Sequence, residues 1–479
     1  MIHQLPDTTA LIPDSVAATD TVPATLLYTI DSLYRVGDTA GVVRILSTTD
    51  STIFTLRDSI VALEMARSDP APILEALRSP ETVQVTNPSR IPEQLGFIGL
   101  IFALFLVPKI LQRYKIPGAI TALLLGVAAT LLGWFHHDPT LNLLSTLGIV
   151  ALFLFAGLEI DASEIKRNAT PLALHAAIWT GTAVVSATLA TMLLGVDPRV
   201  AALLALAVVT PSTGFILNSL ESFGMTPEEQ RTVRTYAIGS EIIALGALFF
   251  ILQSTSLRQL AISIAAMVGV IVIIPLAFRA FATIVAPHAP KSEFAFLVMV
   301  AVVCAYATRL LGVYYLVGAF LVGVAAQRYR ASHPAMSSEK MIDALEAFGS
   351  VFIPFYFFHA GTEIVRGHLT LRSLGIGLAL VAVFVPLRIA VISLHRRFAF
   401  GEPFHVSRRV GAAMVPTLVF TLVITGILER RFGLDDTIAG GLVLYTILNT
   451  LIPGFALGGE PADFVDVEAL PLETPARAG

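Results

Sequence analysis

Long apolar segments with few charges recur along this chain from Leu95 onward, and they constrain its fold more than any other feature. A helix needs roughly 20 such residues to cross the hydrocarbon core of a bilayer, which is about 30 Å thick. The segments predict about thirteen transmembrane helices joined by short loops, and hence an all-α polytopic membrane protein. We place these helices at 95–112, 116–135, 141–160, 171–194, 197–219, 233–252, 258–284, 292–310, 312–327, 343–362, 371–394, 408–428 and 435–456.

The composition agrees with a chain that lies mostly in lipid. Charged residues make up 14% of the 479 residues, compared with about 25% in a soluble globular domain. We therefore expect the lipid bilayer to surround most of the surface. The formal net charge of −4 gives no basis for a nucleic-acid partner. The single cysteine, Cys304, excludes an internal disulfide framework and a cysteine-based metal site.

The predicted domain organisation has three parts. Residues 1–94 form a polar N-terminal tail, rich in Thr, Asp and Pro, which we expect to be small and helical or partly disordered. Residues 95–457 form the transmembrane domain, which we divide into repeat 1 at about 95–252, a linker helix at about 258–284 and repeat 2 at about 292–457. Residues 458–479 form a short acidic C-terminal tail.

Basic residues predict the orientation in the membrane. They are concentrated in the loops after the odd-numbered helices, for example at Lys109, Lys166 and Arg396, and this side is therefore expected to face the cytoplasm. An odd number of helices then places the C-terminus in the cytoplasm and the N-terminus outside, in the inner (cytoplasmic) membrane. No signal peptide is apparent, so either the first helix translocates the N-terminal tail or the natural chain begins elsewhere.

Three short motifs recur in the same order about 200 residues apart, which is the mark of an internal repeat. They are Leu124–Ala129 with Leu321–Ala326, Ala156–Ile160 with Ala360–Ile364, and more weakly Val209–Thr213 with Met414–Thr417. Each pair joins helices that are seven positions apart, and an odd offset reverses the direction through the membrane. The sequence thus predicts two inverted-topology repeats, which are typical of alternating-access secondary transporters. Gly126, Gly318 and Gly323 are expected to allow close helix packing.

Prolines interrupt two helices at repeat-related positions. Pro211 lies in Thr210–Gly214 of the fifth helix, and Pro416 lies between Val415 and Thr417 of the twelfth. Proline removes a backbone hydrogen bond, and Ser or Thr hydroxyls can satisfy the freed carbonyl groups. Either proline alone is best explained as a plain kink. Both together favour two discontinuous helices that cross near the midplane and expose their ends to a substrate.

Glu241 lies near the middle of the sixth helix, where an unpaired charge costs at least about 2.5–3.5 kcal/mol. A structural carboxylate held by hydrogen bonds is one interpretation. The other is a carboxylate that holds either a proton or a desolvated alkali cation, since burial disfavours the bare charge. Competition for one such site, carried across by a moving bundle, is antiport. Oxygen atoms of Ser240, Thr210, Ser212 and Thr213 would then complete a ligand set for Na⁺ or K⁺.

Two further polar residues lie within predicted helices. Arg388 of the eleventh helix is expected to stay charged and to stabilise the helix ends or a neighbouring carboxylate, although its side chain could also extend to the cytoplasmic interface. His359 of the tenth helix is a candidate proton relay or pH sensor, but such a histidine is more often a satisfied polar group at a helix contact. By the repeat offset, Glu241 corresponds to a position near Tyr445.

With these residues in view, the chain from Leu95 to Pro453 resembles the monovalent cation:proton antiporters of the sodium/hydrogen exchanger type. The resemblance is strongest to the branch that includes the glutathione-gated potassium efflux antiporters. Phe153–Asp161 is similar to the end of that family's third helix, Gly318–Gly323 to its glycine-rich helix, and Thr210–Gly214 to its unwound helix. The resemblance implies a bacterial sodium/proton antiporter-like fold, a homodimer, no cofactor and no metal beyond the transported cation.

The resemblance also implies roles for three residues. Glu241 would be the ion- and proton-binding carboxylate, and Arg388 would be the basic residue before the second unwound helix. Glu241 stands where the family usually has Asp, and Ser240 replaces its first acidic or amide residue. One carboxylate in place of two implies electroneutral exchange, and it leaves room for a changed ion or a lost activity.

The sequence therefore predicts a secondary active transporter, and not an enzyme, that exchanges Na⁺ or K⁺ for H⁺ across the inner membrane by alternating access. Two other functions stay open. A sodium-coupled organic-anion transporter with the same inverted repeats would have a larger central cavity and no proton-coupled role for Glu241. A membrane sensor would use the N-terminal tail as its receptor.

Overall fold

The structure is a computed structural model, and it describes residues 93–134, 138–160, 162–254, 256–289, 292–310, 315–330 and 339–458. The chain divides into two units, residues 1–97 and 98–479, and nearly all of the described residues belong to the second unit. Nearly all of the predicted N-terminal tail (1–94) and of the predicted C-terminal tail (458–479) lies outside the described residues.

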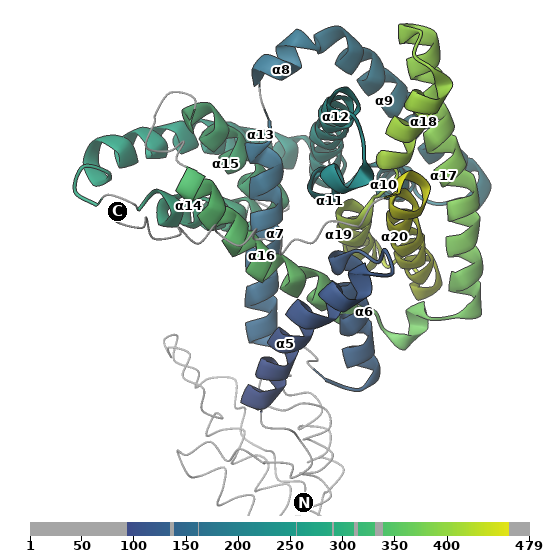
Figure 1. Ribbon diagram of the computed structural model, residues 1–479, viewed down its shortest axis with the longest axis horizontal. Coiled ribbons are helices and arrows are strands. Elements are labelled where there is room, and N and C mark those ends of the chain that lie inside the picture. The colour runs from purple at the N-terminus through teal and green to yellow at the C-terminus, as the bar shows by residue number, and fades with distance from the viewer. Residues whose placement is uncertain are drawn as a thin grey trace, which may run out of the picture. The chain divides into compact units, whose positions relative to one another are not determined.

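Helices make up most of the described residues (Figure 1). They are α5 (Glu93–Gln112), α6 (Gly118–Leu131), α7 (Pro139–Leu158), α8 (Ala162–Arg167), α9 (Ala169–Leu194), α10 (Pro198–Val209), α11 (Thr213–Ser219), η2 (Glu221–Phe223), α12 (Pro227–Gln253), α13 (Leu257–Ala280), η3 (Phe281–Val285), α14 (Glu293–Leu310), α15 (Tyr315–Arg330), α16 (Glu339–Thr362), η5 (Arg366–His368), α17 (Leu371–Phe400), α18 (Phe404–Ala413), α19 (Leu418–Phe432) and α20 (Asp436–Leu457).

These helices confirm an all-α membrane protein. Within the described residues, nine helical segments are long and apolar enough to cross a membrane, and α18 with α19, bent by 45°, would form a tenth. Two shorter helices, α6 and most of α15, are also apolar. Each predicted transmembrane segment overlaps a helix or a helix pair, but the count of thirteen crossings remains a prediction.

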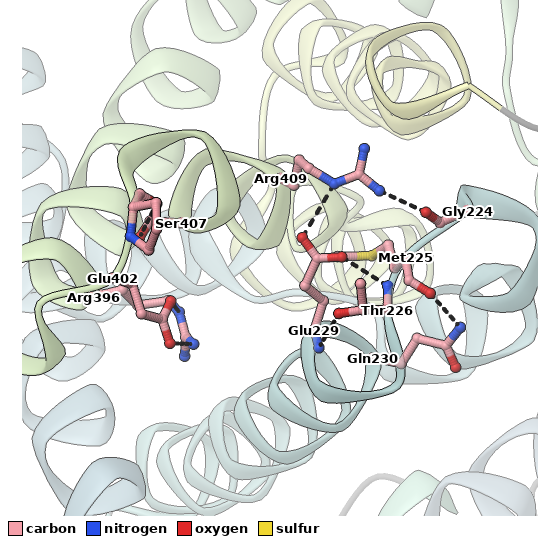
Figure 2. Close-up of polar contacts among 10 residues, drawn as sticks. Gly224, Met225, Thr226, Glu229, Gln230, Arg396, Glu402, Ser407 and Arg409 are labelled. Carbon is pink, nitrogen blue, oxygen red and sulfur yellow. Dashed lines mark hydrogen bonds and ion pairs between the residues drawn. The ribbon is translucent and has the colours of Figure 1, made fainter.

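The start of α12 illustrates how local sequence sets a helix boundary. The Thr226 side chain accepts a hydrogen bond from the Glu229 backbone N–H, and the Glu229 carboxylate accepts one from the Thr226 N–H. This capping box, with Pro227 at the first helical position, begins the helix. Arg409 of α18 donates to Glu229 Oε1 at 3.2 Å and to the Gly224 carbonyl at 2.8 Å (Figure 2), so it ties α18 to this end of α12.

The helices of the second unit pack into two groups (Figure 1). In the first group α7 packs against α15 and α16, α16 also packs against α6, and α14 packs against α15. In the second group α17 packs against α18 and α20, while α10 packs against α9 and α19. We call the first group the glycine bundle (α6, α7, α14, α15, α16) and the second the crossing bundle (α9 to α12 and α17 to α20).

Close glycine contacts in the glycine bundle reveal an internal two-fold relation. A Cβ atom on Gly126 would lie 2.9 Å from Cα of Gly361, and a Cβ atom on Gly157 would lie 2.9 Å from Cα of Gly323. In the recurring motifs Gly126 corresponds to Gly323, and Gly157 corresponds to Gly361. Exchanging the two halves therefore turns one contact into the other, as two inverted repeats require.

The crossing bundle contains the two discontinuous helices. Helix α10 ends at Val209 and α11 begins at Thr213, while α18 ends at Ala413 and α19 begins at Leu418. The extended segments between them touch, because the Ser212 N–H donates to the Pro416 carbonyl at 2.8 Å. The Val419 N–H also donates to Ser212 Oγ at 3.4 Å. The predicted crossing of two broken helices is thus present.

Candidate functional site

The crossing brings four helix ends into the interior of the crossing bundle. Helices α10 and α18 end there, and α11 and α19 begin there. The last carbonyl groups and first N–H groups of a helix have no partner within it, and burying them without one is costly. The residues that meet these groups define the site.

Arg388 and Tyr445 satisfy the two C-terminal ends. Arg388 of α17 donates from Nη1 to the Val415 carbonyl at 2.5 Å and from Nη2 to the Met414 carbonyl at 2.6 Å. Its side chain is buried and is directed at the crossing rather than at an interface. The Tyr445 hydroxyl donates to the Val208 carbonyl of α10 at 2.7 Å.

A carboxylate and an amide meet the two N-terminal ends. Glu241 of α12 is 2% exposed, and its carboxylate is within hydrogen-bonding range of the side chain and the backbone of Thr213. At the start of α19, the Thr417 N–H donates to Asn449 Oδ1 at 3.2 Å. The Asn449 amide nitrogen in turn donates to Thr417 Oγ1 at 2.9 Å. The beginning of α11 is thus the end that faces an acidic group.

Three buried oxygen atoms, on Glu241 and on residues at the break between α10 and α11, are available to a ligand. They are Oε2 of Glu241 and the hydroxyl oxygens of Thr210 and Thr213, and none has a well-directed hydrogen bond to another described residue. A buried polar atom left in this condition costs about 1–3 kcal/mol. A proton on the carboxylate, or a cation bound between the oxygens, would remove that cost. This donor set fits an alkali cation, which binds at the oxygen-rich ends of broken helices.

The other predicted ligands make hydrogen bonds elsewhere. Ser212 Oγ accepts from the Val419 N–H, and Ser240 Oγ lies 3.0 Å from Nε2 of His175. Gly214 lies one residue into α11, where a Cβ atom would be 3.1 Å from the Leu152 side chain of α7. This glycine lets α11 approach the glycine bundle closely.

His359 lies in the glycine bundle and not at the crossing. Its Nδ1 is 3.4 Å from Oγ1 of Thr362, one turn later in α16, and α16 packs on α6 and α7. A relay role for His359 stays a prediction.

Sequence reasoning missed three polar residues of the crossing bundle. Asn449 lies one turn after Tyr445 on α20, and this polar pair in an apolar helix was a usable signal. His175 of α9 and His395 of α17 are buried, but each occurs as a single histidine in its own helix. Only the packing of α9, α12 and α17 shows that the two rings lie 6.2 Å apart, measured between centroids.

Comparisons with known proteins identify the architecture. Residues 97–458 match the family described as "Sodium/hydrogen exchanger, transmembrane". An Na⁺/H⁺ antiporter of Enterococcus hirae is 25% identical over 377 residues, which is 75% of this chain and 96% of that protein. The Na⁺/H⁺-K⁺ antiporter GerN of Bacillus cereus is 23% identical over 346 residues, which cover 70% of this chain and 88% of GerN. The solved structure of the sodium proton antiporter MjNhaP1 from Methanocaldococcus jannaschii superposes with a TM-score of 0.57 at 15% identity. The superposition covers 75% of this chain and 94% of the MjNhaP1 chain.

Proposed function

We propose that Glu241 binds the transported cation and the proton in turn, in a chain that belongs to the sodium/hydrogen exchanger family. Members of this family exchange a monovalent cation for protons across a membrane. The observation that carries this proposal is the position of Glu241. Its buried carboxylate lies at the start of α11 within hydrogen-bonding range of Thr213, and the Thr210 hydroxyl at the same helix break has no hydrogen bond to another described residue. We assign these three side chains as the inner ligands, because the hydroxyls of Ser212 and Ser240 are engaged by other groups.

The exchange cycle follows from charge balance at Glu241. A protonated carboxyl group and a carboxylate with one bound monovalent cation have the same net charge, so each form neutralises the buried acid. The two ions therefore compete, and one proton crosses for each cation in the opposite direction. Arg388 keeps its charge throughout, and it holds the Val415 and Met414 carbonyls so that the crossing keeps its shape.

Alternating access would come from movement between the two bundles. The crossing bundle carries Glu241, whereas the glycine bundle is stiffened by its close glycine contacts. Two half-exposed ion pairs join the bundles, Glu159 with Arg234 at 3.6 Å and Glu363 with Arg430 at 3.8 Å. Exposed pairs of this kind contribute roughly 0–1 kcal/mol each, which is small enough to break during a transport cycle.

The transported cation is proposed to be Na⁺, with K⁺ as the second candidate. Both the Enterococcus hirae relative and GerN have Na⁺ in their names, and the name of GerN includes K⁺. We further propose that the protein is a homodimer in the inner membrane. The side rich in basic residues, to which Arg396 and Arg409 belong, would face the cytoplasm.

An organic-anion transporter is less well supported by the geometry. The cavity described beside the crossing has a volume of about 30 Å³, whereas pockets for organic ligands measure about 300–1,000 Å³. Its lining includes Pro211 and Arg388, so it reaches the crossing, although Glu241, Thr210 and Thr213 are not among the lining residues. A space of this size accommodates about two water molecules.

Proton flux in proteoliposomes tests the role of Glu241. A pH gradient is imposed, Na⁺, K⁺ or Li⁺ is added, and an internal dye follows the pH for wild type, Glu241→Gln and Glu241→Asp. We expect Na⁺ to collapse the gradient in wild type, the Gln variant to lose the response by about 100-fold or more, and the Asp variant to keep part of it. Glu228→Gln changes an exposed residue of the same helix and serves as the control.

Either of two results would contradict the proposal. An active Glu241→Gln variant would show that another group binds the ions. If no alkali cation moved protons in wild type, the organic-anion function would take precedence.

A further inference from the structure

We propose that His175 and His395 form a proton-transfer pair that connects the Glu241 site with the Arg396–Glu402 end of the crossing bundle, apart from the route of the cation. The proposal rests on the proposed function in one respect, because Glu241 is taken as the final proton acceptor. It concerns two histidines that the exchange cycle above does not use. Both line the cavity that reaches Pro211 and Arg388 at the crossing.

His395 has fewer hydrogen-bond partners than His175. Its side chain is 7% exposed, and neither ring nitrogen has a hydrogen bond to another described residue. Leaving both nitrogens unpaired in an apolar interior is costly. Since the ring borders a cavity with room for about two water molecules, water in that cavity is the natural partner for these nitrogens.

His175 stands between the cavity and the helix turn that carries Glu241. Its Nε2 lies 3.0 Å from Oγ of Ser240, the residue immediately before Glu241. Its ring stacks on the ring of Tyr236 with centroids 4.1 Å apart, and it lies 6.2 Å from the ring of His395. Both rings border the same cavity, so water in that cavity is the link between the two imidazoles.

Charged groups mark the far end of this path. Arg396, next to His395 on α17, forms a two-point ion pair with Glu402 (Figure 2) and lies 5.5 Å above the Tyr236 ring. Glu402 is 27% exposed, so this ion pair contacts solvent. The groups that face the histidines are therefore Tyr236 of α12, the guanidinium groups of Arg388 and Arg396 of α17, and Glu402 before α18.

The cavity lining favours protons over alkali cations. It has no carboxylate among its described residues, and it combines the two imidazoles with the Thr182 hydroxyl, the Arg388 guanidinium and apolar side chains. Imidazole nitrogens accept protons readily, whereas Na⁺ and K⁺ require several oxygen ligands. A proton passed between water and imidazole groups needs no oxygen ligand set, which this lining does not offer.

The transfer requires no other reactant. His395 accepts a proton from water at the Arg396–Glu402 end on one ring nitrogen and releases the proton of its other nitrogen to water in the cavity. His175 repeats this exchange toward Ser240 and the turn of Glu241. The Glu241 carboxylate gains one proton as one cation leaves. Each imidazole is neutral again once it has released its proton but is left in its other tautomer, and ring rotation or tautomer exchange restores the starting form.

The test compares two kinds of transport by purified protein in proteoliposomes. Sodium-driven proton flux requires both ions, whereas exchange of radioactive ²²Na⁺ for unlabelled Na⁺ at equal concentrations requires the cation site and alternating access but no proton. We expect His395→Gln and His175→Gln to slow proton-coupled exchange by about tenfold or more. Their ²²Na⁺ self-exchange should stay within about twofold of wild type, and the deficit should grow at alkaline pH, where protons are scarce.

His405→Gln is the matched control, because His405 is an exposed histidine near the same end of the crossing bundle. Wild-type proton flux in both histidine variants would overturn the proposal. A parallel loss of both kinds of transport would overturn it too, since the histidines would then support the structure or the cation site. A Glu241→Gln variant that retains both activities would instead contradict the proposed function, so the two failures are distinguishable.

Discussion

At the scale of single residues, Arg388 acts as a fixed positive charge. Its two terminal nitrogens donate to adjacent carbonyls at the end of α18, which matches the planar, forked shape of a guanidinium group. A lysine has one nitrogen and could reach one of these carbonyls but not hold both in the same geometry. The shape of the group therefore matters at this position as well as its charge.

We expect Arg388→Gln to lower the melting temperature of the detergent-purified protein by about 5 °C, because two charge-assisted hydrogen bonds worth about 3 kcal/mol are lost. Arg388→Lys should keep part of this stability but lose most transport activity. Arg408→Gln, an exposed arginine of α18, should leave both properties unchanged. Equal melting temperatures for wild type and Arg388→Gln would show that the carbonyls find other partners.

The sequence pointed to Glu241 and Arg388 because a charged residue stands out in an apolar helix. It could not point to His395 in the same way. A single histidine in a predicted helix is common and does not indicate a function by itself. The role proposed for His395 depends on a cavity formed by three helices from both halves of the chain. The Ser240 hydroxyl was predicted to bind the cation, but its contact with His175 of another helix could not be inferred from spacing.

At the scale of elements, a buried histidine joins three segments at the end of the crossing bundle opposite Arg396. His368 of η5 places Nε2 2.7 Å from Oε1 of Glu429 in the last turn of α19, and 3.9 Å from Oδ1 of Asp436 in the first turn of α20. The hydrogen bond to Glu429 raises the pKa of His368 above its usual 6.5, in spite of burial. The protonated imidazole of His368 therefore stabilises the contact between η5, α19 and α20.

This pKa shift predicts a pH-dependent stability. Because the folded-state pKa is raised, the contribution of His368 is fully present below about pH 6.5 and is lost as the pH rises through the raised value. We expect the melting temperature of wild type to fall more between about pH 6 and pH 9 than that of His368→Gln. The contribution lost in the Gln variant should be about 1 kcal/mol, since Glu429 is partly exposed.

Glu429→Gln should remove the same pH dependence, because it removes the group that favours protonation. Differential scanning fluorimetry of the three proteins at matched ionic strength measures this directly. Parallel melting curves for wild type and both variants across the pH range would contradict the assignment.

A hydropathy pattern locates the apolar part of a membrane helix but not its ends. The predicted segments 233–252 and 371–394 find the apolar parts of α12 and α17, but these helices span Pro227–Gln253 and Leu371–Phe400. The additional residues of α12 are mostly polar, and those of α17 begin with His395, Arg396 and Arg397, so the apolar stretch that a hydropathy pattern detects is interrupted at both places. The capping box at Thr226 was a readable signal for the true start of α12.

At the scale of the whole second unit, the two bundles are joined by two ion pairs whose acidic members occupy repeat-related positions. Glu159 follows α7 and pairs with Arg234 of α12, while Glu363 follows α16 and pairs with Arg430 of α19. Glu159 and Glu363 occupy the same place in the recurring motif. Because the repeats are inverted, the two pairs lie toward opposite ends of the unit.

Movement between the bundles can be tested by cross-linking. Cys304 is replaced by Ala, and cysteines at Glu159 and Arg234 are joined by bifunctional maleimides of graded length. We expect short linkers to stop sodium-driven proton flux almost completely, because they prevent relative movement of the bundles. Cysteines at Thr130 and Thr362, which contact each other inside the glycine bundle, should be cross-linked without loss. Full transport in the Glu159–Arg234 cross-linked protein would exclude such movement.

The crossed glycine contacts have a consequence for how such a chain could arise. Gly126 meets Gly361 and Gly157 meets Gly323, so each contact takes one member from each half. Neither half can complete this packing on its own. Two identical copies of a single half, inserted in opposite orientations, would form both contacts at once. An ancestral gene of half the length would therefore have needed a product that entered the membrane either way up, and fusion of two copies would have fixed one orientation for each half.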